Sequence, residues 1–182
     1  MAKSAMKAKV LGAKDLVHDV GDDAAYLAIV DLGSYAKDLP DWDYFSLTKK
    51  IAADMSAGRI VAWGCPEGPL TVRLTTKTAG PKRANAKYVS TLVTKGQLCL
   101  VGYTSLTMCA QFEDQRFPQS GDLLFSIAPG TYTVTVYRLF AHEAGEQFPA
   151  EPLPASDHYE VTFAPGGTAI AHATVPWAPP ID

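Results

Sequence analysis

Four side chains at two points of the chain carry the clearest potential for chemistry. His142 and Glu143 end one strand-like run, and His158 and Glu160 begin the next one. Imidazole and carboxylate groups are ligands that Zn²⁺ and Fe²⁺ accept, with coordination positions left open for water. If the two runs pair, both histidines emerge at the same edge of a sheet. One hypothesis is therefore a metal-dependent jelly-roll enzyme acting on a small molecule, and the simpler alternative is that both histidines flank a surface loop.

A second candidate is the acidic aromatic stretch D-L-P-D-W-D-Y-F at residues 38–45. Aromatic anchors inside a polar rim are typical of protein interfaces, and acidic loops can imitate a phosphate backbone in front of a basic partner. The stretch predicts a non-catalytic binding protein, such as an inhibitor or immunity-type protein of a bacterial toxin or nuclease. The alternatives are that its aromatics plug the core and that an aspartate caps a helix. The expected contact residues are Asp38, Asp41, Trp42, Asp43 and Tyr44.

Other catalytic signatures are missing from the sequence. It contains no G-x-x-x-x-G-K-[ST] or G-x-G-x-x-G phosphate loop, no G-x-S-x-G elbow and no H-E-x-x-H. The three cysteines are an odd number without C-x2-C spacing, so we expect reduced thiols. Cys99 and Cys109 are expected to be small buried hydrophobes, and Cys65 has no base near it in sequence to activate it as a nucleophile. We expect no cofactor, and the binding hypothesis stands ahead of the enzyme.

Charge is unevenly distributed along the 182 residues, although the formal net charge is only −3. Residues 15–54 contain nine aspartates and three lysines, a net −6, and the remaining residues contain ten acids and thirteen bases, a net +3. Six of those bases lie between Glu67 and Glu113, where there is no acid. Such a dipolar surface can steer a charged partner, although charge runs also serve solubility. The acidic balance argues against direct nucleic-acid binding.

The strands are expected to be organised around residues 122–142, two β-like runs joined at Pro129-Gly130. In the second run Tyr132, Val134 and Val136 alternate with threonines, which is typical of a half-buried strand. The Pro-Gly pair suits a type II turn, which can form a corner as well as a hairpin. The run P-G-T-Y-T-V is similar to a phrase common in bacterial immunoglobulin-like and prealbumin-like sandwich domains. This similarity supports a sandwich and indicates no particular family.

About ten strand candidates, one helix and no repeated βαβ pattern predict a single, mostly β domain over residues 1–182. The expected architecture is an antiparallel β-sandwich of Greek-key or jelly-roll type with one packed α-helix. The helix is predicted at about 45–57, because Leu47, Ile51 and Met55 recur every four residues. A strand is expected over 105–112, and an extended tail over 176–182.

No part of the sequence approaches the roughly 20 apolar residues that a membrane-spanning helix needs. The first residues have lysines but no apolar h-region behind them, so they do not resemble a secretory signal. We therefore expect a cytoplasmic protein with a protein partner. Self-association through strand edges stays open as a third hypothesis.

Overall fold

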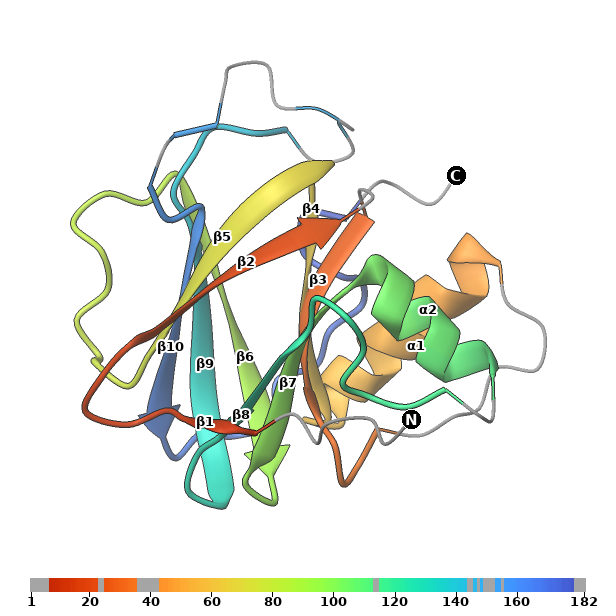
Figure 1. Ribbon diagram of the computed structural model, residues 1–182, viewed down its shortest axis with the longest axis horizontal. Helices are drawn as coiled ribbons and strands as arrows, with labels where there is room; N and C mark the ends of the chain where they lie inside the picture. Colours follow the sequence, from red (N-terminus) through yellow and green to blue (C-terminus); the bar gives the residue numbers. More distant parts are fainter. Residues whose placement is uncertain are drawn as a thin grey trace.

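The computed structural model describes residues 7–22, 25–35, 43–112, 115–143, 146, 148, 153–154 and 156–178, and within them the strands form two five-stranded sheets (Figure 1). Sheet A has the order β1-β8-β7-β3-β4, and sheet B has the order β2-β5-β10-β9-β6. The strands are β1 Lys9–Val10, β2 Leu16–Asp22, β3 Ala25–Asp31, β4 Ile60–Cys65, β5 Gly68–Thr75, β6 Ala86–Thr94, β7 Gln97–Gly102, β8 Leu123–Ser126, β9 Gly130–Arg138 and β10 Tyr159–Pro165. The helices are α1 Tyr44–Ser56 and α2 Tyr103–Gln111.

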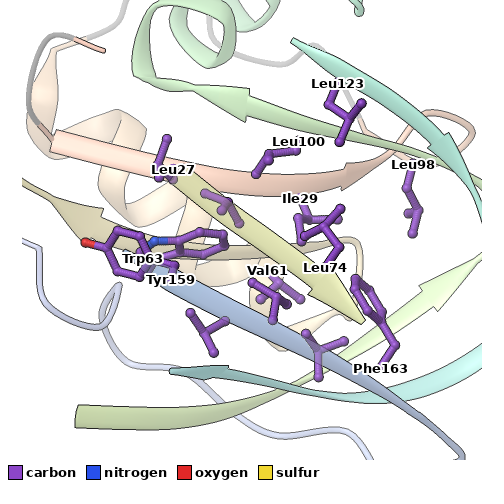
Figure 2. Close-up of a cluster of buried hydrophobic side chains, with 14 of the residues drawn as sticks. Leu27, Ile29, Val61, Trp63, Leu74, Leu98, Leu100, Leu123, Tyr159 and Phe163 are labelled. Atoms are coloured by element: carbon purple, nitrogen blue, oxygen red, sulfur yellow. The ribbon is translucent and has the colours of Figure 1, made fainter. Parts of the chain in front are cut away.

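The core between the two sheets follows from the alternation of apolar residues along the strands. On β9, Tyr132, Val134 and Val136 are buried and the threonines between them are half-exposed. They pack in one cluster with side chains of sheet A such as Leu27 and Ile29 (Figure 2). Burying one large apolar side chain stabilises the fold by about 1.5–3 kcal/mol, so this layer is the main source of stability. The predicted mostly β sandwich is confirmed.

A second apolar layer joins α1 and α2 to the outer face of sheet A (Figure 1). The predicted stripe of Leu47, Ile51 and Met55 is buried on α1, and the helix begins and ends within one residue of the expected range. Asp43 caps its first turn, and Gly58 follows its last turn with φ of +70°. No described helix is long and apolar enough to cross a membrane.

Segment 105–112 corrects the sequence expectation of a strand, because most of it lies in α2. Leu106, Cys109 and Ala110 are all buried at the spacing i, i+3, i+4, which is the period of a helix face against a sheet. The β-branched threonines around them favour a strand locally. Packing against β3 and β7 outweighs that preference.

The sheets are mixed, whereas the sequence predicted antiparallel pairing throughout. β1 pairs with β8 and β10 pairs with β5 in parallel, and the other pairs are antiparallel. The turn at Pro129-Gly130 joins β8 of sheet A to β9 of sheet B, so it is a corner between sheets and not a hairpin. β9 lies inside sheet B, between β10 and β6.

Residues 166–178, which we call the C-terminal strap, run along the side of the sandwich between β4 and β6. The Gly64 amide of β4 donates to the Pro176 carbonyl at 2.8 Å. On β6, Thr91 Oγ1 donates to the Thr168 carbonyl, and the Tyr88 ring lies edge-on to Trp177 with centroids 5.4 Å apart. The strap therefore joins two edge strands that do not pair with each other.

Candidate functional site

The two histidines of the metal hypothesis lie at the same end of the sandwich. β9 and β10 pair in antiparallel register with Arg138 opposite Tyr159. The segment that follows β9 and the segment that precedes β10 therefore lie at the same end of the sheet. The Phe140 ring lies 6.0 Å from the His142 ring and 6.0 Å from the His158 ring, between centroids.

The predicted metal ligands nevertheless do not assemble. His158 accepts a hydrogen bond from the Thr71 amide at Nδ1, 2.7 Å away, and its Nε2 lies 3.0 Å from the Pro154 carbonyl. Both ring nitrogens are therefore engaged. Glu160 lies between the inward residues Tyr159 and Val161, on the outer face of sheet B and in register with Arg73, and Glu143 is exposed. Among the described residues no three His, Cys, Asp or Glu side chains are placed to hold a metal ion.

This end of the sandwich instead gathers buried hydrogen-bond donors. Arg138 ends β9 in the inward register of Val134 and Val136 and is only 8% exposed. Its Nε and Nη1 have no hydrogen-bond partner, and neither have His142 Nδ1 and Trp63 Nε1, within the described part of the chain. Sequence reasoning missed Arg138 as a site residue, although the alternation that predicts an inward Val136 predicts an inward arginine two residues later.

Aromatic rings surround these donors. The Arg138 guanidinium carbon lies 5.0 Å from the centroid of the Trp177 ring, which places the cation over the indole face. The Tyr159 ring lies 6.4 Å from Trp177 and 5.6 Å from Trp63, and Figure 2 shows Trp63 and Tyr159 side by side. Burial lowers the pKa of Arg138, and burial together with the Arg138 charge lowers the pKa of His142. His142 is therefore neutral at pH 7.

The acidic aromatic stretch is described from Asp43 onward, while Asp38, Asp41 and Trp42 lie outside the described residues. Asp43 is exposed, and its Oδ1 accepts a hydrogen bond from the Ser46 amide at 2.7 Å. That bond lowers the pKa of the carboxyl group. Tyr44 is half-buried and stacks on Tyr26, with ring centroids 5.7 Å apart and an angle of 6° between planes. Tyr44 therefore contributes to packing.

Phe45 is the outward-facing aromatic residue of this stretch. It is 45% exposed, and the Lys49 ammonium lies 3.8 Å from its ring centroid. Tyr44 precedes Thr48 and Ile51 by four and seven residues, so it falls on the buried stripe of α1, and Phe45 falls beside it. The distinction between the two aromatics follows from the helical period once the start of the helix is known.

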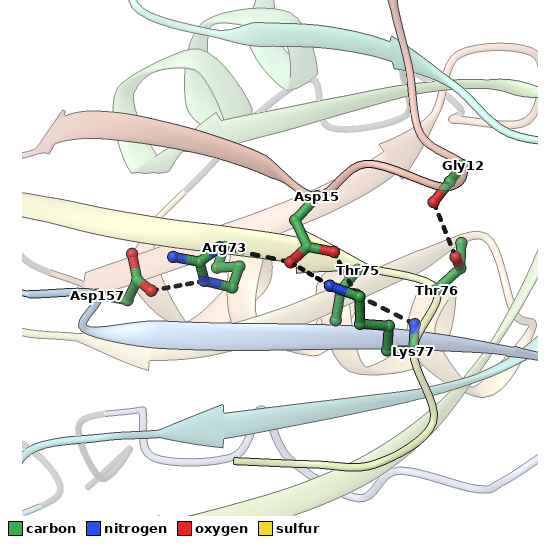
Figure 3. Close-up of polar contacts among 7 residues, drawn as sticks. All are labelled: Gly12, Asp15, Arg73, Thr75, Thr76, Lys77 and Asp157. Atoms are coloured by element: carbon green, nitrogen blue, oxygen red, sulfur yellow. Dashed lines mark hydrogen bonds and ion pairs between the residues drawn. The ribbon is translucent and has the colours of Figure 1, made fainter.

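The acidic segment is partly neutralised inside the protein. Asp15 pairs with Arg73 at 3.4 Å and Lys77 at 3.1 Å, and Arg73 also pairs with Asp157 at 2.6 Å (Figure 3). Asp54 is buried on α1, with Lys50 at 2.6 Å and Arg59 at 2.9 Å. Asp31 is fully buried and hydrogen-bonded. Among the described residues, the exposed carboxylates that no ion pair neutralises include Asp43 at the start of α1 and Asp19 on β2.

The cysteines are buried, as predicted for Cys99 and Cys109. Burial raises the pKa of the Cys109 thiol to about 11 and that of Cys99 further above its ordinary value. Cys65 is also buried and belongs to the core cluster between the sheets. At pH 7 Cys99 and Cys109 are therefore protonated thiols, which are poor nucleophiles.

No protein-family model matches the chain, and no curated protein matches its sequence. Two solved structures resemble its fold. The protein titled "Crocagin biosynthetic gene J" superposes with a TM-score of 0.51 at 15% identity, covering 83% of this chain and 95% of its own. ComJ from Bacillus subtilis, titled an inhibitor of the DNA degrading activity of NucA, gives 0.48 at 9% identity, covering 84% and 98%. The first likeness shows that this mostly β sandwich fold is shared with another protein.

Proposed function

We propose that the protein is a non-catalytic binding protein that contacts a basic macromolecular partner through the acidic aromatic surface at the start of α1. The observation that carries the proposal is the exposure of Phe45. This phenylalanine is 45% exposed in the first turn of the helix, beside the exposed carboxylate of Asp43. Asp38, Asp41 and Trp42, which precede it in sequence, complete the proposed contact.

The composition of this surface matches what an interface uses. An exposed phenylalanine gains free energy when a partner covers it, and aromatic anchors of this kind are frequent hot spots. The Asp43 carboxylate, with the aspartates that precede it in sequence, would attract a basic partner and repel an acidic one, which mainly raises the association rate and the specificity. The proposed partner is therefore a protein with a basic, aromatic-accepting groove.

An inhibitory role follows from the same chemistry. A nuclease or nucleic-acid-directed toxin binds phosphates through a basic groove. A row of carboxylates with an aromatic anchor can occupy such a groove in place of the nucleic acid. Binding there would block the partner without any catalysis by this protein, as an immunity-type protein does.

Two substitutions test the contributions of charge and of the aromatic ring to binding without disrupting the helix. Asp43→Asn removes the negative charge but keeps the cap, because asparagine caps helices as well as aspartate. Phe45→Ala removes the exposed ring. Phe112→Ala is the matched control, since Phe112 is 47% exposed just beyond the end of the other helix.

The experiment is affinity capture from an extract of the source organism with these variants. We expect one basic protein to be retained by the wild type and by Phe112→Ala. Its retention should fall about tenfold or more with Phe45→Ala, as for a hot spot, and less with Asp43→Asn. Equal retention by all four proteins would contradict the proposed surface.

A further inference from the structure

We infer that the end of the sandwich at Arg138 is a binding site for a small carboxylate or phosphate group, separate from the proposed interaction surface on α1. Arg138 and His142 are each only 8% exposed, and Trp63 is fully buried. Four of their nitrogen atoms have no hydrogen-bond partner among the described residues: Arg138 Nε and Nη1, His142 Nδ1 and Trp63 Nε1. Nothing in the proposed function uses these side chains.

The chemistry of the unpaired atoms selects the ligand. The guanidinium and indole nitrogens can only donate hydrogen bonds, and the imidazole can donate from Nδ1 in one of its two neutral forms or when protonated. In the described part of the chain no acidic residue forms an ion pair with Arg138. The carboxylate of Glu146 lies 4.0 Å from His142 Nδ1. A buried cation that no described side chain pairs is costly to keep, and a bound anion would offset that cost. The ligand that suits these donors is therefore an oxyanion.

The walls of the site indicate what the anion is attached to. Phe140 and Tyr159 have ring centroids 5.5 Å apart, and Tyr159 also contacts Trp63 and Trp177. Aromatic walls with a few convergent polar groups are typical of sites for small organic ligands. An anion with an apolar or aromatic body therefore fits better than a bare hydrated ion.

Trp177 is the aromatic residue that contacts the Arg138 guanidinium. Its ring covers the guanidinium at 5.0 Å, and its own side chain is only half-buried. The residue has φ of +59°, a conformation that costs a tryptophan free energy, and it belongs to the strap and to no strand. The Trp177 ring also packs on Tyr88 of β6 and Tyr159 of β10, so a ligand that reaches the guanidinium meets the indole first.

The test is a thermal-shift titration of the full chain with sodium benzoate, with benzyl alcohol as the neutral control and inorganic phosphate as the alternative anion. For a fragment of this size we expect a dissociation constant of about 1 mM. Benzoate at about ten times that concentration should then raise Tm by about 4 °C. A thermal shift with benzoate but not with phosphate indicates a carboxylate ligand. A shift with both compounds indicates a general oxyanion site. Both results support the inference.

Arg138→Met and His142→Phe show whether the response comes from this site. Arg138→Met should abolish the shift, and its own Tm without ligand should equal or exceed that of the wild type, because an unpaired buried charge has been removed. A purely structural arginine would instead leave Arg138→Met less stable. His142→Phe should weaken benzoate binding several-fold, and it keeps the test valid if Arg138→Met does not fold.

Three results would overturn the inference. The first is no shift with benzoate or phosphate. The second is an equal shift with benzyl alcohol, which would show that an apolar additive is sufficient. The third is an unchanged benzoate shift in Arg138→Met, or in His142→Phe if the methionine variant is unfolded. As a direct signal, benzoate should also change the fluorescence of the wild type, and Trp177→Phe should remove most of that change.

Discussion

At the scale of single residues, Asp31 shows how a buried charge can be fully satisfied. Its Oδ1 accepts a hydrogen bond from the Gly33 amide at 3.0 Å, and its Oδ2 accepts from Thr94 Oγ1 at 2.6 Å and the Lys95 amide at 2.9 Å. One carboxylate thus ties the turn after β3 to the turn between β6 and β7. Arg138 is the opposite case, a buried charge whose partners are missing from the described chain.

Replacement of Asp31 by alanine should therefore destabilise the fold strongly. The substitution leaves three donors without their acceptor, of which the Thr94 hydroxyl is buried, and it removes three hydrogen bonds to a charged group, each worth about 1.5–3 kcal/mol. We expect the free energy of unfolding to fall by about 3 kcal/mol or more in urea denaturation, with an intermediate loss for Asp31→Asn. A loss below about 1 kcal/mol, the range of ordinary surface substitutions, would show that the two turns are held by other contacts.

At the scale of elements, the C-terminal strap depends on a close approach to β4 at Gly64. A Cβ atom built on Gly64 would overlap the carbonyl of Trp177, whereas one built on Gly21 of β2 would meet nothing within 4 Å. The strap therefore requires glycine at position 64 and places no such demand on position 21.

Gly64→Ala should displace the strap, at a cost of about 1–3 kcal/mol of unfolding free energy, as overpacking substitutions show. Gly21→Ala is the matched control in a strand and should change stability by less than about 0.5 kcal/mol. Hydrogen exchange of the strap amides should speed up in the first variant alone. Equal stability of the two variants would mean that the strap is not held against β4.

The strands that alternate cleanly, such as β5 and β9, were predictable because each has one buried face. α1 was predictable for the same reason, since its stripe and its caps agree. α2 was not, because its threonines favour a strand and only contact with sheet A selects the helix. The site at Arg138 was hidden for another reason. Its residues come from β4, β9, the segment after β9, β10 and the strap, and only the register of sheet B and the path of the strap bring them together.

At the scale of the whole molecule, the two proposed sites lie at one end of the sandwich. Tyr44 stacks on Tyr26, Tyr26 pairs with Gly64 across β3 and β4, and Gly64 contacts Trp177, which covers Arg138. A chain of direct contacts thus connects the start of α1 to the buried arginine. The other end of the sandwich carries the corner at Pro129-Gly130 and the turn at Lys95-Gly96, where Asp31 is fully paired.

The most direct measurement for the binding account is photo-crosslinking in the source cell from a benzophenone side chain placed at position 45, with position 112 as the control. We predict a single adduct with a basic protein from position 45, none of that mass from position 112, and a weaker adduct when Asp43→Asn is added. An absence of adducts at position 45, or the same adducts from both positions, would contradict the assignment of the α1 surface as the contact site.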